Sequence, residues 1–462
     1  MHDFFALLKK IDIYKNSSII FFIFLSSFIV FGHSLTFGFF IFDDYTHILG
    51  NYNFDQSSFL KIFKHLERPF IPLTYLIWGV ISYFFGKDNA FYFHLLNLVF
   101  HSLNAFLVFI WIKEFFRVLN VSIDEKKIII ASFVGAMLFL LHPLKVESVV
   151  WISGFKDILS FNLAILSFIL FLKSKNNILY LFYSLGMLGL AGFAKPNVVI
   201  LILFFFLFDF FHFKMNKKRG MLYLGMFLAF SLFVFFYYKG SLEFGNFLVM
   251  PNFFATVSMA SSVIVFYIIK FIWPVSLSFD YGLHFEALKP DIKIYLSVLF
   301  VLAISLFVLW RFKNNKKNDT ISISIILFFI LLLPVLGFMP FLFQNISTVA
   351  DRFMYFPSLA ISFLCATLYL AFFEKKDNRR SMAVFYIFLL ACLSITQSFK
   401  WKTDERILTH SFNINKDSYP LAMALATIAE KEKKLDRALD YYRKANRIKP
   451  SDMHSYGKIL KL

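Results

Sequence analysis

The sequence predicts an all-α protein built as a polytopic bundle of membrane-spanning helices. Hydrophobic residues make up 59% of the 462 residues and charged residues only 16%, against about 25% charge in an ordinary soluble domain. Apolar stretches of about 17–23 residues recur along the chain, and this length crosses a bilayer as a helix. The stretches are uniformly apolar rather than alternating, so the pattern is not that of a membrane β-barrel.

The formal net charge of +18 has its simplest explanation in membrane orientation. The basic residues lie in short loops between apolar stretches, where they keep loops in the cytoplasm. We therefore expect membrane lipids as partners and no nucleic acid. Cys365 and Cys392 both lie inside apolar runs, and they suggest neither a disulfide framework nor a metal motif.

The first span covers residues 19–42. Three lysines before it predict a cytoplasmic N-terminus, and Asp43 and Asp44 then emerge on the outer face. Residues 68–86 begin with Arg-Pro, which favours a helix lying in the outer interface, with Tyr75, Trp78 and Tyr83 at headgroup depth.

Ten further spans bring the expected total to about eleven. They are residues 91–112, 128–146, 157–172, 178–194, 197–213, 221–238, 292–310, 321–343, 353–373 and 382–399.

Residues 254–277 decide the side of every later loop. If this apolar piece crosses the membrane, the basic cluster that includes Arg311 and Lys313 faces outward. If it is re-entrant or interfacial, every dense basic cluster lies on one side. Because that agreement follows the positive-inside pattern, we expect the second arrangement and a C-terminal tail outside the cytoplasm.

The tail changes character after Trp401. We expect a membrane domain over residues 1–400 and a helical domain over 401–462. Residues 419–452 fit one tetratricopeptide unit, with Ala438, Tyr442 and Ala445 at the spacing of its second helix. An ordinary amphipathic hairpin is the alternative. A lone unit cannot bury its apolar face, so it should pack on the membrane domain, on a helix over 403–416, or on a partner.

The predicted topology collects charged residues on the outer face, where such residues next to an apolar bundle indicate a functional site. The set is Asp43, Asp44, His47, Arg68, His142, Lys145, Glu147, Lys156, Asp157, Lys195, Asp280, His284, Asp351 and Arg352.

This set suits glycosyl transfer from a lipid phosphate. An acceptor hydroxyl is a poor nucleophile, so a carboxylate must take its proton during attack. The leaving group is already a phosphate anion and needs positive charge rather than a general acid. We expect four cations to bind this phosphate: Arg68, Lys156, Lys195 and Arg352. We expect His142, Glu147 and Asp157 to orient the acceptor or the base.

The order of several motifs resembles the TMTC-type family of multispan proteins, which are similar to protein O-mannosyltransferases of the GT-C fold. The motifs are FDDY, RPFIPLTY, FYFHLLNLVFH, LHPLKVESVVWISGFKDILS, AKPN and ADRFMYFPS, followed by the tetratricopeptide-like tail. The resemblance implies a polyprenyl-phosphate sugar as donor, mannose as the sugar, and a catalytic base at Asp44 or Asp43. We prefer Asp44 because it lies one residue further from the apolar run.

Two departures from that family concern the site. Lys156 stands where the family often has arginine, which keeps a phosphate-binding charge next to Asp157. Lys195-Pro196 stands where the family often has Lys-Glu, so an acidic partner is missing there. The tail also has one repeat unit where the family has several.

Each candidate also has a structural interpretation. Asp43 and Asp44 could cap a helix end or, with His47, hold a divalent cation, and Arg68 could anchor the interface. His142 and Glu147 could order a turn. For the stripe His94, Asn97, His101 and Asn104 we favour helix–helix hydrogen bonds over a metal site.

The sequence thus predicts an inverting glycosyltransferase with an aspartate base. It would act on a protein hydroxyl or glycan acceptor outside a bacterial or archaeal cytoplasmic membrane, with a possible protein partner on the tail. The rival hypotheses are a non-catalytic assembly scaffold that uses the tail, and a lipid or solute transporter. Repeated halves and mid-membrane charges would be typical of a transporter.

Overall fold

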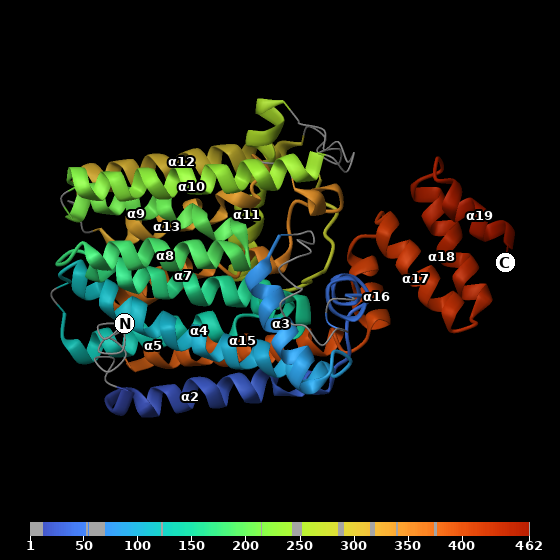
Figure 1. The fold of residues 1–462 in the computed structure, drawn as a ribbon, viewed down its shortest axis with the longest axis horizontal. Coiled ribbons are helices and arrows are strands. Elements are labelled where there is room, and N and C mark those ends of the chain that lie inside the picture. The colour runs from blue at the N-terminus through green and yellow to red at the C-terminus, as the bar shows by residue number, and fades with distance from the viewer. Residues whose placement is uncertain are drawn as a thin grey trace.

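A computed structural model describes residues 13–51, 54, 70–121, 123–213, 215–242, 252–284, 291–314, 319–338, 341–373 and 377–461. All regular secondary structure in these ranges is helical. The protein is therefore an all-α membrane protein, as its composition predicts. Its long helices lie side by side in one bundle, and four shorter helices project from one end of that bundle (Figure 1).

Seven helical segments of the described chain are long and apolar enough to cross a membrane, or eight if a bent pair counts as one span. They are Ser17–Thr36, Ala90–Val118, Ile152–Lys173, Pro196–Phe213, Phe253–Ile272, Ile292–Asn314 and Arg380–Lys400, with Glu125–Leu141 and Pro143–Val150 as the bent pair. Four further apolar helices are shorter: Pro72–Phe85, Leu179–Ala194, Thr320–Val335 and Ser358–Phe372. The predicted total of eleven spans therefore stays a prediction.

Helix α4 (Ala90–Val118) lies at the centre of the N-terminal half. It packs against α2 (Ile13–Phe31), α5 (Glu125–Leu141) and α7 (Phe155–Lys173). The aromatic residues on its inner face are buried, and Trp111 and Phe115 interlock with Phe168 of α7 at ring-centroid distances of 4.9 and 5.7 Å. Such packing fixes α7 against α4, and the N-terminus of α7 carries Lys156 and Asp157.

The rest of the bundle follows in chain order. It comprises α8 (Leu179–Ala194), α9 (Leu201–Phe208), α10 (Lys217–Leu242), α11 (Phe253–Ile272), α12 (Ile292–Asn314), α13 (Thr320–Leu332), α14 (Ser358–Leu368) and α15 (Asp377–Lys400).

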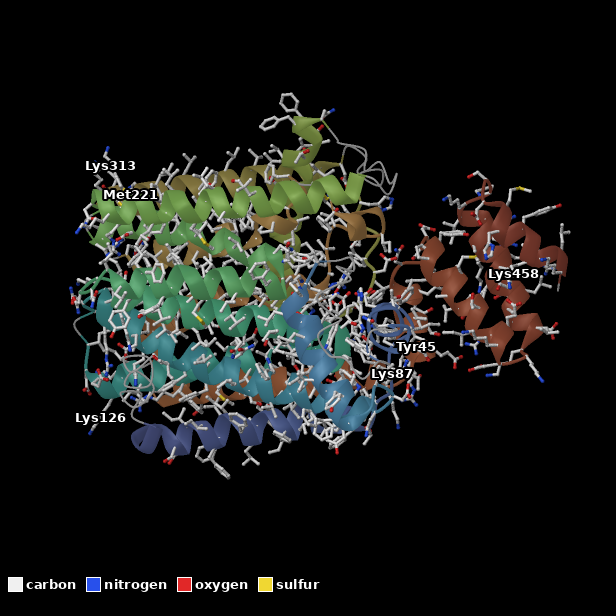
Figure 2. All side chains as sticks on the ribbon, in the orientation of Figure 1. Tyr45, Lys87, Lys126, Met221, Lys313 and Lys458 are labelled. Atoms are coloured by element: carbon white, nitrogen blue, oxygen red, sulfur yellow. The ribbon has the colours of Figure 1, made fainter. Side chains whose placement is uncertain are left out.

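The two ends of the bundle differ in the loops that they carry. Figure 2 shows Lys126 and Lys313 at one end, which we call the basic end, and Tyr45 and Lys87 at the opposite end, which we call the site end. Helix α10 begins at the basic end near Met221 and α12 finishes there near Lys313 (Figures 1 and 2). The chain therefore leaves α10 and enters α12 at the same end, and α11 does not transfer it to the other side. This agrees with the expected role of residues 254–277.

Helix α3 (Pro72–Phe85) lies at the site end. Tyr75 and Trp78 are buried and pack inward on His47, whereas Tyr83 is exposed. The expected headgroup depth of these rings stays a prediction. Arg68 lies outside the described residues.

The tail consists of α16 (Asp404–Ile414), α17 (Tyr419–Lys431), α18 (Leu435–Ile448) and α19 (Met453–Lys461). The predicted repeat residues Ala438, Tyr442 and Ala445 are buried in the α17–α18 hairpin, and so are Leu425 and Ala426 of α17. Helix α16 packs on α17, and α19 packs on α18. The helix over 403–416 thus covers the hairpin, which was one of the expected arrangements. A tetratricopeptide assignment stays a prediction.

Candidate functional site

The predicted acidic pair belongs to a short irregular segment, residues 37–44, which we call the carboxylate loop. It connects the 3₁₀ turn Gly32–Thr36 to the π-helical turn Tyr45–Leu49. The two carboxylates face different surroundings, although they are adjacent in sequence. That difference decides what each of them can do.

Asp44 points into the protein and is 1% exposed. Its Oδ2 accepts a hydrogen bond from the Phe40 N–H at 2.8 Å, and its Oδ1 accepts from the Ser153 N–H at 2.9 Å and the Ser153 hydroxyl at 2.5 Å. Burial raises the pKa of Asp44 to about 7, although these hydrogen bonds oppose the rise. Asp44 therefore ties the carboxylate loop to the turn that precedes α7.

Asp43 points outward, and its side chain is 38% exposed. Its Oδ2 accepts a hydrogen bond from Lys156 Nζ at 2.7 Å. Burial of the carboxyl favours the neutral form, but the positive charges of Lys156, His47 and Arg352 outweigh it and lower the pKa of Asp43 to about 2. Asp43 is thus ionised at neutral pH and open on one side.

Ser153 is the residue that sequence reasoning missed in this arrangement. It lies in the 3₁₀ turn Ile152–Gly154, inside the WISG part of a motif already noted. A Cβ on Gly154 would lie 2.2 Å from the Ser148 carbonyl oxygen, so only glycine allows the turn to close this tightly. The glycine next to a serine was the available signal, and the closed turn aims Ser153 at Asp44.

His47 connects the segment after the carboxylate loop to helix α3. It shares a hydrogen bond with the Tyr75 hydroxyl at 2.9 Å and stacks on Trp78. Burial and the charge of Lys156 lower the pKa of His47 to about 4, despite the opposing effect of Asp43. The imidazole is neutral at neutral pH, and it holds its place through the hydrogen bond with Tyr75.

Lys195 has a carboxylate partner after all, because it pairs with Asp157. The acid that appeared to be missing at position 196 is supplied from α7. Burial lowers the pKa of Lys195, and the charge of Asp157 opposes this effect. Asp157 is thus occupied by the lysine in this structure, and an orienting role toward the acceptor stays a prediction.

Next to this pair lies a small, partly open hollow. Polar residues Asp157, Lys195 and Asn197 line one part of it, and apolar side chains line the rest. The apolar part comprises Val198, Ile200, Leu331, Pro334, Val335, Phe353 and Phe356. The Lys195–Asp157 pair thus lies beside an apolar wall.

Arg352 is held in a buried aromatic cluster. Its guanidinium pairs with Glu147, and Glu147 Oε2 also accepts the Arg352 backbone N–H at 2.8 Å. The guanidinium carbon lies 4.2 Å from the Phe343 ring centroid and 5.4 Å from that of Trp151. Glu147 therefore orients Arg352, rather than an acceptor as we expected.

His142 serves the bend between α5 and the next helix. Its Nε2 donates to the Phe271 carbonyl at 2.9 Å, its Nδ1 accepts from the Leu144 N–H at 3.2 Å, and its ring stacks on Phe271. Both nitrogens are used, and the side chain is fully buried. The alternative in which His142 orders a turn is thus favoured over a role with the acceptor.

The polar stripe on α4 makes hydrogen bonds between helices, as expected. Asn97 donates to the Trp151 carbonyl at 2.8 Å, His101 contacts the Tyr355 hydroxyl at 2.8 Å, and Asn104 donates to the Ile158 carbonyl at 2.9 Å. Within the described ranges, no group of three or more His, Cys, Asp or Glu side chains is placed to hold a metal ion. The alternative of a divalent cation at Asp43 and Asp44 stays untested.

Comparison with known proteins adds a distant similarity. Over 487 aligned residues the chain is 22% identical to the human protein O-mannosyl-transferase TMTC3. The alignment covers 91% of this chain and 50% of the relative. Over 495 residues it is 21% identical to the mouse protein of the same name, with the same coverage. The chain thus spans about half the length of the curated relatives it matches. No protein-family model and no solved structure matches it.

Proposed function

We propose that this chain is a membrane glycosyltransferase that moves a sugar from a polyprenyl-phosphate donor to a hydroxyl acceptor at the site end. The observation that carries this proposal is the setting of Asp43. It is an ionised, partly exposed carboxylate beside Lys156, at the end of a membrane bundle. The distant similarity to two protein O-mannosyl-transferases supports the same class of reaction.

In this reaction the acceptor oxygen attacks the anomeric carbon of the sugar as the bond from that carbon to the phosphate oxygen breaks. The hydroxyl proton passes to a carboxylate, and polyprenyl phosphate leaves as an anion. A single attack from the side opposite the phosphate inverts the anomeric configuration. The chain needs to supply one base and several cations, and the site contains both.

We assign the base to Asp43 and a positioning role to Asp44. Both Asp44 oxygens already accept hydrogen bonds from Phe40 and Ser153, and the side chain is buried. Asp43 keeps an open side toward the exterior. This reverses our sequence-based preference for Asp44, which rested only on distance from the apolar run.

Lys156 and Lys195 are the cations best placed for the donor phosphate. Lys195 stands at the polar rim of the hollow, where the apolar wall that includes Val198 and Leu331 suits the first isoprene units. The Lys156 ammonium already contacts a carboxylate at 2.7 Å and can turn to a phosphate with little movement. Arg352 is buried and paired with Glu147. We therefore give it no direct contact with the phosphate; its positive charge helps to lower the pKa of Asp43.

The names of the two relatives support mannose as the sugar and an oxygen of a protein as the acceptor. We propose that this oxygen belongs to a Ser or Thr hydroxyl. The basic end suits the cytoplasm, so we propose that the site end and the tail lie outside it. The bacterial or archaeal cytoplasmic membrane stays a prediction from the sequence. A transporter is disfavoured because the charged pairs described above at Asp43, Asp157 and Glu147 gather near one end of the bundle.

The test is to compare three purified variants for sugar transfer. Asp43→Asn should lower kcat by about 10²–10⁴-fold, which is the usual contribution of a general base, with little change in thermal stability. Asp44→Asn should lower stability as well, because an amide nitrogen must face the N–H of Phe40 or Ser153. Asp88→Asn replaces an exposed carboxylate and should match the wild type. Wild-type turnover in Asp43→Asn would refute the assignment.

A further inference from the structure

The helix that follows the last span reaches back to the carboxylate loop. Asp404 is the first residue of α16, and its Oδ1 accepts a hydrogen bond from the Ile41 N–H at 3.1 Å. The preceding N–H group, that of Phe40, donates to Asp44 at 2.8 Å. Two adjacent backbone N–H groups of the loop are thus held by two carboxylates, one local and one from the far end of the chain.

Aromatic packing reinforces this contact just before α16. Trp401 lies 5.3 Å from Phe40 and stacks on Trp151 at 6.1 Å, measured between ring centroids. Trp151 precedes the turn that carries Ser153. The entry to α16 therefore contacts both the loop that carries Asp43 and the turn that binds Asp44.

The other end of α16 is fixed to the same neighbourhood. The Ser411 hydroxyl oxygen accepts from the Phe279 N–H at 3.1 Å. Phe279 in turn stacks on Phe42 with a centroid distance of 5.3 Å and an interplanar angle of 11°. Because both ends of α16 are anchored, the Asp404 carboxylate has a fixed position from which to hold Ile41.

We propose that Asp404 is a positioning residue for the reaction, which holds the carboxylate loop so that Asp43 meets the acceptor hydroxyl. It does not touch substrate and acts through the Ile41 backbone. The inference rests on the proposed function, since it assigns Asp43 as the group to be positioned. It also makes α16 a part of the site rather than of a separable tail.

A merely structural role is the competing explanation, because a carboxylate in the first turn stabilises any helix. Glu405 provides the matched control. It lies in the same first turn of α16 but pairs with Arg437 of α18, away from the carboxylate loop. Asp404→Asn provides the conservative variant, since its amide oxygen can still accept from Ile41.

The test combines steady-state kinetics with amide hydrogen exchange of peptides covering residues 37–44, in the full-length protein. In Asp404→Ala, kcat should fall roughly ten- to a hundredfold, as for a small misplacement of a catalytic group, with an unchanged KM for the donor and faster exchange of the loop. Asp404→Asn should retain most of the activity, and Glu405→Ala should match the wild type in both measurements.

Unchanged exchange in Asp404→Ala would overturn the proposal, and so would faster exchange with unchanged kcat. A kcat loss of equal size in Glu405→Ala would assign the effect to α16 stability instead. The exchange measurement does not depend on the chemistry. If the wild type transfers no sugar, the proposed function fails, and the positioning role in catalysis fails with it, while faster loop exchange would still establish the hold on Ile41.

Discussion

Asp43 and Asp44 illustrate how two identical side chains acquire opposite roles from their surroundings. The first faces lysine and the exterior, and the second faces three hydrogen-bond donors in the interior. Environments that push two carboxyl pKa values apart are typical of sites in which each group has its own task. Here the pKa values are about 2 and about 7.

This separation predicts the pH dependence of transfer. The profile of kcat/KM reports the pKa values of the free enzyme, and a base must be unprotonated to act. With Asp43 as the base, kcat/KM should stay level from pH 7 down to about pH 5, since its pKa of about 2 lies far below. His47, with a pKa of about 4, also stays neutral over this range.

The contrary result is equally definite. If Asp44 were the base, kcat/KM would fall tenfold per pH unit below its pKa of about 7. The Asp88→Asn variant should keep the wild-type profile and controls for general effects of charge at the site end. Because Asp44 also has a positioning role, the pH–rate profile is measured together with the Asp43→Asn and Asp44→Asn variants.

The sequence predicted most of the residues at this scale but not their pairings. The charged residues expected on one face of the apolar bundle do form ion pairs with one another. They are Asp43, Lys156, Asp157, Lys195, Glu147 and Arg352. Which cation meets which carboxylate depends on tertiary geometry, so the pairs Asp157–Lys195 and Glu147–Arg352 could not be derived. Asp404 lies 363 residues from its partner Ile41, and no local pattern marks such a contact.

At the scale of elements, the bent connection between α5 and α7 organises the site. The chain turns at Pro143, runs through the short helix Val146–Val150 and closes the turn Ile152–Gly154 before α7 begins. The bend between Glu125–Leu141 and Pro143–Val150 is 54°. This path carries Glu147, Ser153 and Lys156 within one short segment.

Gly154 is the position at which this connection should be least tolerant. In Gly154→Ala the new methyl group would meet the Ser148 carbonyl oxygen, so the turn must open and withdraw Ser153 from Asp44. We expect a loss of about 1–3 kcal/mol in unfolding free energy, as for other overpacked positions, together with reduced transfer. Thermal unfolding in detergent and an activity assay measure the two effects.

Gly186→Ala is the matched control for this substitution. Gly186 lies in the interior of α8, and a Cβ there would meet no atom within 4 Å. Alanine in a helix interior should leave stability unchanged or raise it slightly. If Gly154→Ala were as stable and as active as Gly186→Ala, the turn would not be the fixed element described here.

At the scale of the whole molecule, composition and charge predicted the class of fold and the common side of the basic loops. Lys126 and Lys313 do lie at one end, with the carboxylate loop at the other (Figure 2). Hydropathy could not fix the number of crossings, because α3 and α8 are apolar but short, and α11 is long but returns the chain to the same end. Packing, rather than length, decides the course of such helices.

The proposed function assigns one role to the whole arrangement, which is chemistry on a lipid-linked anion at the membrane surface. The hollow beside Lys195 has an apolar wall that a soluble nucleotide sugar would not need. The protein should therefore discriminate between donors by their lipid rather than only by their sugar. This expectation separates the proposed enzyme from an assembly scaffold, which would use no donor.

The most direct measurement is release of polyprenyl phosphate from a panel of polyprenyl-phosphate sugars by the purified protein, with a hydroxyl-bearing peptide as acceptor. We expect release with at least one sugar, of which mannose is the first to test, an inverted anomeric linkage in the product, and no release by Asp43→Asn. Absence of release from every donor, or equal release by Asp43→Asn, would contradict the assignment of this protein as a lipid-phosphate-dependent glycosyltransferase.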